Sequence, residues 1–469
     1  MKADTYQRQL QHLYWRTGFG PSPAQMQQAP GNLNKAVKGV FSQSVSYAPL
    51  PLTITDFSRL PKGQLSPEER RRQMQQARRE LAKINTTWLQ TMATSPAQLR
   101  EKMAFFWHGH FACRTQRPEF ALNQVNLLRQ HALGKFSDLL MAVAKDPAML
   151  QFLNNQQNRK LQPNENFARE LLELFTLGRG HYSEEDIKNA ARAFTGWGYD
   201  AEGMFVFRER QHDAGTKTFL GKIGNFTGED ILRIILDQPQ TAKFLTTKIY
   251  RFFVNDTPDA AVIQQLSEQF YATDYDIQAL LQKIFSTDWF YAPANIGTRI
   301  KSPVELLTGL QRAFAIQFQD APGLLVVQRA LGQVLLYPPN VGGWPGGRNW
   351  IDSSSLMFRM KLPQTIFAGA SLNISLKDDD IDMLPQLSQQ ERTFNRRLRV
   401  NVNLQPFREL LAKVPPRAIV AQTAAFLLQV PLNAQLTTML QNDTDEFTPE
   451  NRLNALALRL SSLPEYQLC

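Results

Sequence analysis

The sequence carries one helix-start signal four times, and this signal limits the chain to a largely helical fold. A capping serine is followed by proline at the first helical position and by glutamate or glutamine at the third. The signal runs from Ser22 to Gln25, Ser66 to Glu69, Ser95 to Gln98 and Ser302 to Glu305. The segments that follow share no period, so these are separate helix starts and not an internal repeat.

Long amphipathic stretches lie between these starts. Apolar residues recur at helical spacing over residues 231–254, in two pieces, and over 259–285 and 304–317. The sequence therefore predicts a predominantly α, large multi-helix globular protein. One strand signal stands out at residues 199–208, where Gly203 separates two extended pieces and predicts a short β-hairpin.

Charge and cysteine content narrow the classes of function. The 52 Lys and Arg against 42 Asp and Glu leave a net charge of +10, but the excess is spread along the chain. The densest cluster, residues 68–80, interleaves acids and has few aromatics, which predicts a solvated helix face and no nucleic-acid binding. The two cysteines, Cys113 and Cys469, support neither a disulfide framework nor a metal-ligand spacing.

The chain lacks the signals of membrane insertion. No stretch has the run of apolar residues that crosses a bilayer, so no transmembrane segment is expected. The N-terminal sequence MKADTYQRQLQHLYW has no apolar core of a secretion signal, and as written it predicts a cytoplasmic protein. If Met1 replaces a removed signal peptide, the expected location is periplasmic or exported.

Helical periodicity fades after residue 367. We predict a main helical domain over residues 1–370, an acidic loop or linker over 371–390, and a C-terminal helical subdomain over 391–469. The linker has four aspartates but neither the glycine nor the closing glutamate of a calcium loop, which favours a solvated connector. In the subdomain, a proline pair at 415–416 predicts a break.

A helix beginning near residue 165 mixes carboxylates and arginines with residues of a buried pattern. Helical spacing places Glu165, Arg169 and Glu173 on one stripe, and Glu170 lies three residues from Glu173. Charges among apolar residues need partners, and such clusters often form sites. A second helix, which Ser183 caps, carries Arg192 toward the same region.

Two interpretations of these charges stay open. In the first, Glu165, Arg169, Glu173 and Arg192 form a structural ion-pair network that fixes the two helices. In the second, Glu170 and Glu173 are metal ligands or an acid/base pair, and Arg169 binds the substrate.

Histidine is scarce, with six in the chain, and His108 and His110 lie two residues apart in EKMAFFWHGHF. We expect Gly109 to end the helix between them, because on a continuous helix the two side chains would point to different faces. Imidazole pairs of this kind bind zinc, iron, copper or manganese. The structural alternative is that His108 favours the negative helix end and His110 packs under Trp107.

His212 and Asp213 are adjacent on a loop that leads to Lys217. The pair suits a metal ion, or proton transfer in which Asp213 acts together with His212. Lys217 then offers a positive charge to an anionic substrate. The alternative is a turn in which Asp213 caps neighbouring backbone groups.

Residues 338–355 combine glycines, prolines and tryptophans in a way that predicts a shaped loop. Trp344 and Trp350 offer stacking faces, and Arg348 suits an acidic group, so the loop is expected to line the cleft of His212 and bind substrate. Its glycine spacing fits neither phosphate-loop motif. The alternative is a rigid plug that wedges its tryptophans into the core.

Several motifs together resemble the bacterial domain of unknown function 1800 family, in collinear order over nearly the whole chain. They are HLYWRTGFGPSP, KMAFFWHGHF, NENFARELLELFTLG, ARAFTGW, HDAGTKTFLG, KSPVE and LGQVLLYPPNVGGWPGGRNWI. The resemblance implies a mostly helical bacterial protein and supplies no reaction. It also implies that similar proteins resemble exported ones and are encoded beside a sulfatase-like family, which makes a sulfatase-like protein an expected partner.

The expected function is metal-dependent catalysis in a helical cleft, with hydrolysis as the expected reaction. His108, His110 and His212 are the expected ligands of a divalent metal ion, and Glu170, Glu173, Asp213 and Lys217 the expected catalytic residues. The alternative is a non-catalytic binding or assembly protein whose charged motifs are structural and whose Trp/Gly loop docks a partner.

Overall fold

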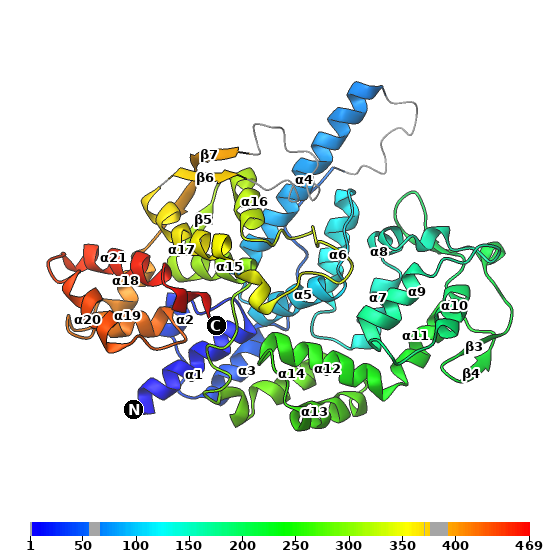
Figure 1. Ribbon diagram of the computed structural model, residues 1–469, viewed down its shortest axis with the longest axis horizontal. Helices are drawn as coiled ribbons and strands as arrows, with labels where there is room; N and C mark the ends of the chain where they lie inside the picture. The colour runs from blue at the N-terminus through cyan, green and yellow to red at the C-terminus, as the bar shows by residue number, and fades with distance from the viewer. Residues whose placement is uncertain (1, 56–65, 370, 376–392) are drawn as a thin grey trace.

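The computed structural model describes residues 2–55, 66–369, 371–375 and 393–469. Helices dominate the described parts, and the strands there form two-stranded antiparallel sheets (Figure 1). The prediction of a predominantly α protein is confirmed. Within the described ranges, no helix is both long and apolar enough to span a membrane.

Three of the four predicted helix starts are confirmed, each with both hydrogen bonds of a capping box. They begin α2 (Pro23–Gln27), α4 (Pro67–Thr94) and α15 (Pro303–Phe314). The start at Ser95 was wrong, because Ser95 instead terminates α4 and the next helix, α5 (Gln98–His110), begins later. The Gln98 side-chain oxygen accepts the Phe19 amide, and its nitrogen donates to the carbonyl oxygens of Met92 and Ser95, so Gln98 does not bind the Ser95 amide as a capping box requires.

The N-terminal third is built around α4 and α5. The C-terminal half of α4 is buried against α6, α15 and α16, whereas its N-terminal half extends beyond the other elements (Figure 1). The remaining helices here are α1 (Lys2–Thr17), α3 (Leu33–Gln43), α6 (Pro118–Gln130), α7 (Phe136–Ala144) and α8 (Pro147–Phe152), followed by the short η2 (Asn155–Gln157).

The middle of the chain contains the charged helix and two hairpins. The predicted hairpin is confirmed as β1 (Trp197–Tyr199) and β2 (Phe205–Phe207), and a second, unpredicted one joins β3 (Lys217–Phe219) to β4 (Lys222–Gly224). The helical elements are α9 (Asn166–Glu170), η3 (Leu171–Thr176), α10 (Glu184–Ala193), η4 (Glu209–Gln211), α11 (Gly228–Leu236), α12 (Pro239–Phe253), α13 (Ala260–Ala272), α14 (Ile277–Phe285) and η5 (Asp288–Tyr291).

The C-terminal third shares one apolar core with the rest. β5 (Ile316–Phe318) pairs with β8 (Val400–Val402), and buried residues from Leu10 to Tyr466 belong to a single cluster. The other elements are α16 (Ala321–Ala330), η6 (Gly347–Trp350), α17 (Ser353–Ala368), β6 (Ser371–Ser375), β7 (Thr393–Arg397), α18 (Gln405–Leu411), α19 (Ile419–Leu427), α20 (Ala434–Asn442), α21 (Pro449–Ser461) and η8 (Pro464–Gln467).

The predicted linker at residues 371–390 begins as a strand, since its first five residues form β6 and pair with β7. Residues 376–390 of that prediction lie outside the described residues. The predicted break at the proline pair 415–416 falls between α18 and α19. The domain boundaries themselves stay a prediction.

Candidate functional site

The charged helix changes its winding where its carboxylates lie. α9 ends at Glu170 and continues as a π-helix, η3. The wider turn is seen in the hydrogen bond from the Leu177 amide to the Leu172 carbonyl oxygen, at 3.0 Å and five residues apart. This wider turn lies at the C-terminal end of the helix, where π-turns occur. The carbonyl oxygen of Leu174 accepts a hydrogen bond from Lys248, and the carbonyl oxygen of Phe175 binds the His110 ring.

Glu170 and Glu173 occupy different environments on this turn. The carboxylate of Glu173 accepts hydrogen bonds from Arg179, at 2.5 Å, and from the Tyr182 hydroxyl, at 3.1 Å. Glu170 is half-buried and, among the described residues, makes no hydrogen bond or ion pair. Burial, and then the charge of Glu173, raise the pKa of Glu170. The two carboxyl groups therefore differ, since burial raises the pKa of Glu170 whereas Arg179 binds the carboxylate of Glu173.

The ion-pair network predicted for this region is confirmed only for Glu165 and Arg169, and Glu173 and Arg192 do not belong to it. Arg169 pairs with Glu165 at 3.1 Å and with Glu184 at 2.8 Å, and its side chain is 36% exposed. Glu173 pairs with Arg179 instead of joining this group, because the π-helical turn shifts it from the stripe that α-helical spacing predicts. The charges form separate pairs near the surface rather than one buried network.

Arg192 belongs to another cluster, at the opposite end of α10. Its guanidinium donates to both carboxylate oxygens of Asp213, at 2.7 and 3.3 Å. This contact, against an opposing effect of burial, lowers the pKa of Asp213. Asp213 also accepts the Gly215 amide at 2.8 Å, as the turn interpretation predicted.

The ammonium of Lys217 is enclosed by the same loop. It donates to the carbonyl oxygens of Asp213, at 2.6 Å, and Gly215, at 3.0 Å, and approaches the Asn225 side-chain oxygen at 3.5 Å. Three oxygens account for the three N–H donors of a lysine. In this arrangement, Lys217 stabilises the loop and has no free donor for a substrate.

His108 and His110 both lie inside α5, so the prediction that Gly109 ends the helix is wrong. Their rings point to different surroundings, as two residues apart on a helix must. His108 Nε2 accepts the Leu336 amide at 3.1 Å, and burial lowers its pKa to about 3.

His110 has a partner at each ring nitrogen. Nε2 lies 3.0 Å from the Phe175 carbonyl oxygen and Nδ1 lies 3.3 Å from Nζ of Lys248. His212 has its own partner, with Nδ1 3.0 Å from the Thr195 carbonyl oxygen. Within the described ranges, no group of three or more His, Cys, Asp or Glu side chains is placed to hold a metal ion. The three histidines therefore do not form the shared site that the sequence suggested.

The Trp/Gly loop, residues 338–355, packs against the end of α5. Gly343, at φ +80°, lies so close that a Cβ there would be 2.3 Å from the Gly109 carbonyl oxygen. The Trp344 ring lies 5.4 Å from that of His108, and Trp350 is only 7% exposed. These contacts agree with the plug interpretation for one face of the loop. Arg348 is exposed on the other.

A buried charged centre joins three of the sequence motifs. Lys102 pairs with Glu305 at 2.5 Å, and both side chains are 1% exposed. Nζ of Lys301 lies between the rings of Trp15 and Tyr466, 3.8 and 3.7 Å from their centroids. Burial lowers the pKa of Lys301 to about 7. In the sequence, Glu305 is marked only as the third residue of a helix start.

A signal for this centre was present in the sequence. Lys102 stands in the otherwise apolar run KMAFFW, and a charge there needs a distant partner. The partner, Glu305, lies 203 residues away, so spacing along the chain could not identify it.

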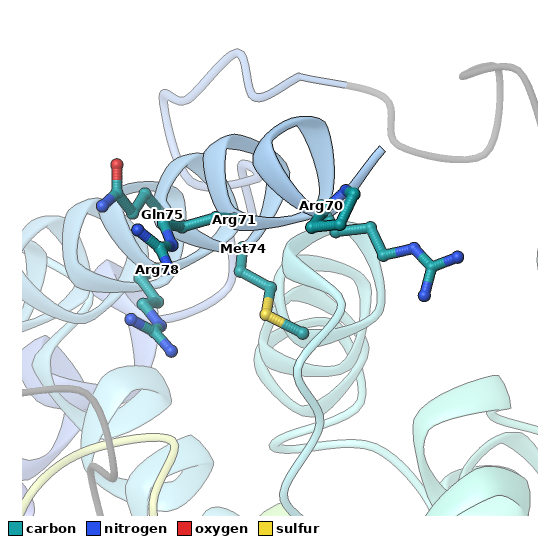
Figure 2. Close-up of a pocket in the computed structure, with 6 residues that line it drawn as sticks. Arg70, Arg71, Met74, Gln75 and Arg78 are labelled. Atoms are coloured by element: carbon teal, nitrogen blue, oxygen red, sulfur yellow. The ribbon is translucent and has the colours of Figure 1, made fainter. Parts of the chain in front are cut away.

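The arginine-rich N-terminal half of α4 is exposed, as predicted for a solvated face. Figure 2 shows Arg70, Arg71, Met74 and Arg78 on this half of α4. They line an open hollow with a volume of about 510 Å³. The acids of this segment are engaged locally, because Glu68 pairs with Arg72 and Glu69 closes the capping box.

Comparison with known families gives one result. The family described as protein of unknown function (DUF1800) matches residues 12–468. The chain belongs to this family. The match spans both the main helical region and the C-terminal helices of this DUF1800 protein. No curated protein and no solved structure matches it.

Proposed function

We propose that this DUF1800 protein is a hydrolytic enzyme in which Glu170 and Glu173 act as an acid/base pair. The observation that carries the proposal is the difference between the two carboxyl groups on one π-helical turn. Glu170 is half-buried with a raised pKa, whereas Arg179 and Tyr182 bind the carboxylate of Glu173. Two neighbouring carboxyl groups in different environments are the usual arrangement of a general acid and a general base.

The roles follow from these environments. Glu170 is the general acid that donates a proton to the leaving group, and Glu173 is the general base that removes a proton from the attacking water. Arg179, whose side chain is 85% exposed, binds the negative charge of an anionic substrate. Arg169 also binds the negative charge of the substrate, but its guanidinium is already paired with the carboxylates of Glu165 and Glu184.

In an alternative to the acid/base assignment, both carboxylates hold a divalent cation, and Glu170 is then not the general acid. Two glutamate carboxylates, with water at the remaining positions, suit magnesium or manganese, which prefer oxygen ligands. When bound, such an ion would polarise the scissile group. Glu173 would then exchange its contact with Arg179 for the metal.

Activity of single-residue variants tests this function. Nitrophenyl esters, phosphates and sulfates would be assayed with the wild-type chain, with and without magnesium or manganese. The active substrate would then be given to Glu170→Gln, Glu173→Gln and, as an exposed control, Glu202→Gln. We expect losses of roughly a hundredfold or more for the first two variants and none for the control. Equal activity of all three variants would refute the acid/base assignment.

The second candidate is a binding role for the Trp/Gly loop. Its support is that Gly343 and Trp350 anchor the loop while Arg348 is exposed. The family resemblance points to a sulfatase-like protein as the partner. Co-purification of that neighbour with the wild-type chain, lost in Arg348→Ala, is the expected result, and retention in the variant would contradict it.

A further inference from the structure

A hollow unrelated to Glu170 lies between the first helix and the C-terminal helices. It has a volume of about 280 Å³ and is bounded by α1, α19 and the segment that follows α19. Its walls are mainly apolar, with Ala424 and Leu428 from α19 and Leu432 beyond it. Small-molecule sites have this composition, with apolar walls and a few polar groups that fix orientation.

Two buried glutamines in this wall are incompletely hydrogen-bonded. The Gln429 side-chain amide donates to the Gln11 side-chain oxygen at 3.2 Å, and each side chain is 1% exposed. Nε2 of Gln11 and Oε1 of Gln429 have no partner. If both amides are turned over, one donor and one acceptor are still left, so the result does not depend on how oxygen and nitrogen are assigned.

Arg8 adds a positive charge to the same hollow. It lines the wall beside Gln11, and its Nε is buried without a partner. The hollow therefore offers an amide donor, an amide acceptor and a guanidinium. Buried polar atoms without partners destabilise the free protein, and a ligand that satisfies them gains from each contact. The terminal torsion of glutamine is broad, so a small rotation presents these atoms to a ligand.

We propose that this hollow binds an acylated apolar amino acid. The ligand's secondary amide supplies a carbonyl oxygen for Gln11 and an N–H for Gln429, its carboxylate binds Arg8, and its apolar side chain packs on Ala424 and Leu428. A free fatty acid offers the carboxylate but no amide. The chemistry is shared by the C-terminal residue of a short peptide and by a fatty-acyl amino acid.

A neighbouring hollow distinguishes a fatty-acyl amino acid from the end of a peptide as the ligand. It has a volume of about 300 Å³, shares Gln7 with the first, and is lined by apolar side chains including Leu10, Met26 and Phe426. A fatty-acyl chain that passes Gln7 would be buried there, whereas an acetyl group would not reach it. Each added buried methylene contributes favourably to binding.

Calorimetric titration with defined probes tests the proposal. The probes are N-acetyl-leucine, N-octanoyl-leucine and octanoate, which lacks the amide. We expect N-acetyl-leucine to bind and octanoate to bind at least tenfold more weakly. Tighter binding of N-octanoyl-leucine than of N-acetyl-leucine would assign the lipid-like source, and equal binding the peptide source. Absence of N-acetyl-leucine binding, or equal binding of octanoate, would overturn the proposal.

Variants separate recognition from folding. Gln11→Met combined with Gln429→Met removes both amides while keeping their bulk, and it should leave the melting temperature unchanged or higher. N-acetyl-leucine binding should fall at least tenfold in this variant and stay unchanged in Gln435→Met, an exposed control on α20. Should the double variant not fold, Ala425→Phe fills the hollow from its wall and should also abolish binding. Unaltered binding in the folded variant would refute the assignment.

Discussion

Replacing Glu305 by glutamine removes one charge from the buried centre and preserves its shape. Burial alone would raise the pKa of Glu305, but Lys102 and Arg299 lower it from 4.5 to about 2. A shift of this size corresponds to roughly 3 kcal/mol of native-state stability at neutral pH. The figure agrees with the roughly 3–5 kcal/mol lost when one partner of a buried pair is removed. Glutamine can still accept the Ser302 amide, so the helix cap is retained.

The pH dependence has a definite sign. Because the folded pKa lies below the unfolded one, the contribution of Glu305 is fully present above pH about 4.5 and is lost as the pH falls toward about 2. Urea unfolding of the wild type and Glu305→Gln should therefore differ by roughly 3 kcal/mol at pH 7, and by progressively less below about 4.5.

The control for this prediction is Glu68→Gln, which removes an exposed partner of Arg72. An exposed pair contributes at most about 1 kcal/mol, so this variant should unfold close to the wild type. If Glu305→Gln is no less stable than Glu68→Gln at pH 7, the argument from buried charge fails. Replacing Lys102 and Glu305 together by methionine should cost less than either single change, since no unpaired charge is left.

Three further perturbations have defined outcomes. Burial raises the pKa of Asp146, the N-cap of α8, to about 7, so its contribution to stability declines as the pH rises from about 4 to 7. The melting temperature of Asp146→Asn should therefore rise relative to that of the wild type as the pH increases over this range. A difference between the two melting temperatures that stays constant with pH would contradict this prediction. Arg169→Ala should change stability by no more than about 1 kcal/mol in thermal melts, because the pairs it breaks are exposed; a larger loss would restore the buried-network interpretation. Gly343→Ala should destabilise the chain by about 1–3 kcal/mol through its positive φ and the contact with Gly109. Gly31→Ala, at an exposed glycine with no atom near the added Cβ and no positive φ, serves as control, and equal melting temperatures of the two variants would exclude the tight packing of the loop.

Local signals in the sequence predicted much of the fold. The helix caps at Ser22, Ser66 and Ser302 were correct because their hydrogen bonds join residues within one turn. The same pattern failed at Ser95, where the Gln98 side chain binds the end of the preceding helix. The hairpin predicted at residues 199–208 and found at 197–207 was also a local prediction, since Gly203 supplies its turn at φ +85°.

The site depended more on distant contacts. Glu170 and Glu173 were recognised as neighbours from their spacing, but the π-helical turn gives Glu173 different partners from those expected. Gly109 was expected to break α5, yet the helix continues through it. An isolated glycine weakens a helix by only about 1 kcal/mol, which packing of the buried neighbours Trp107 and Phe111 outweighs.

The sequence by itself determined the helical class, most helix starts and the family, because these depend on periodicity, caps and motifs within short stretches. The tertiary structure alone decided which charges meet. Lys102 and Glu305, or Gln11 and Gln429, are brought together across more than 200 residues by burial of the shared apolar core. Electrostatic interactions depend on distance in space and on local dielectric, and neither quantity is encoded by position along the chain.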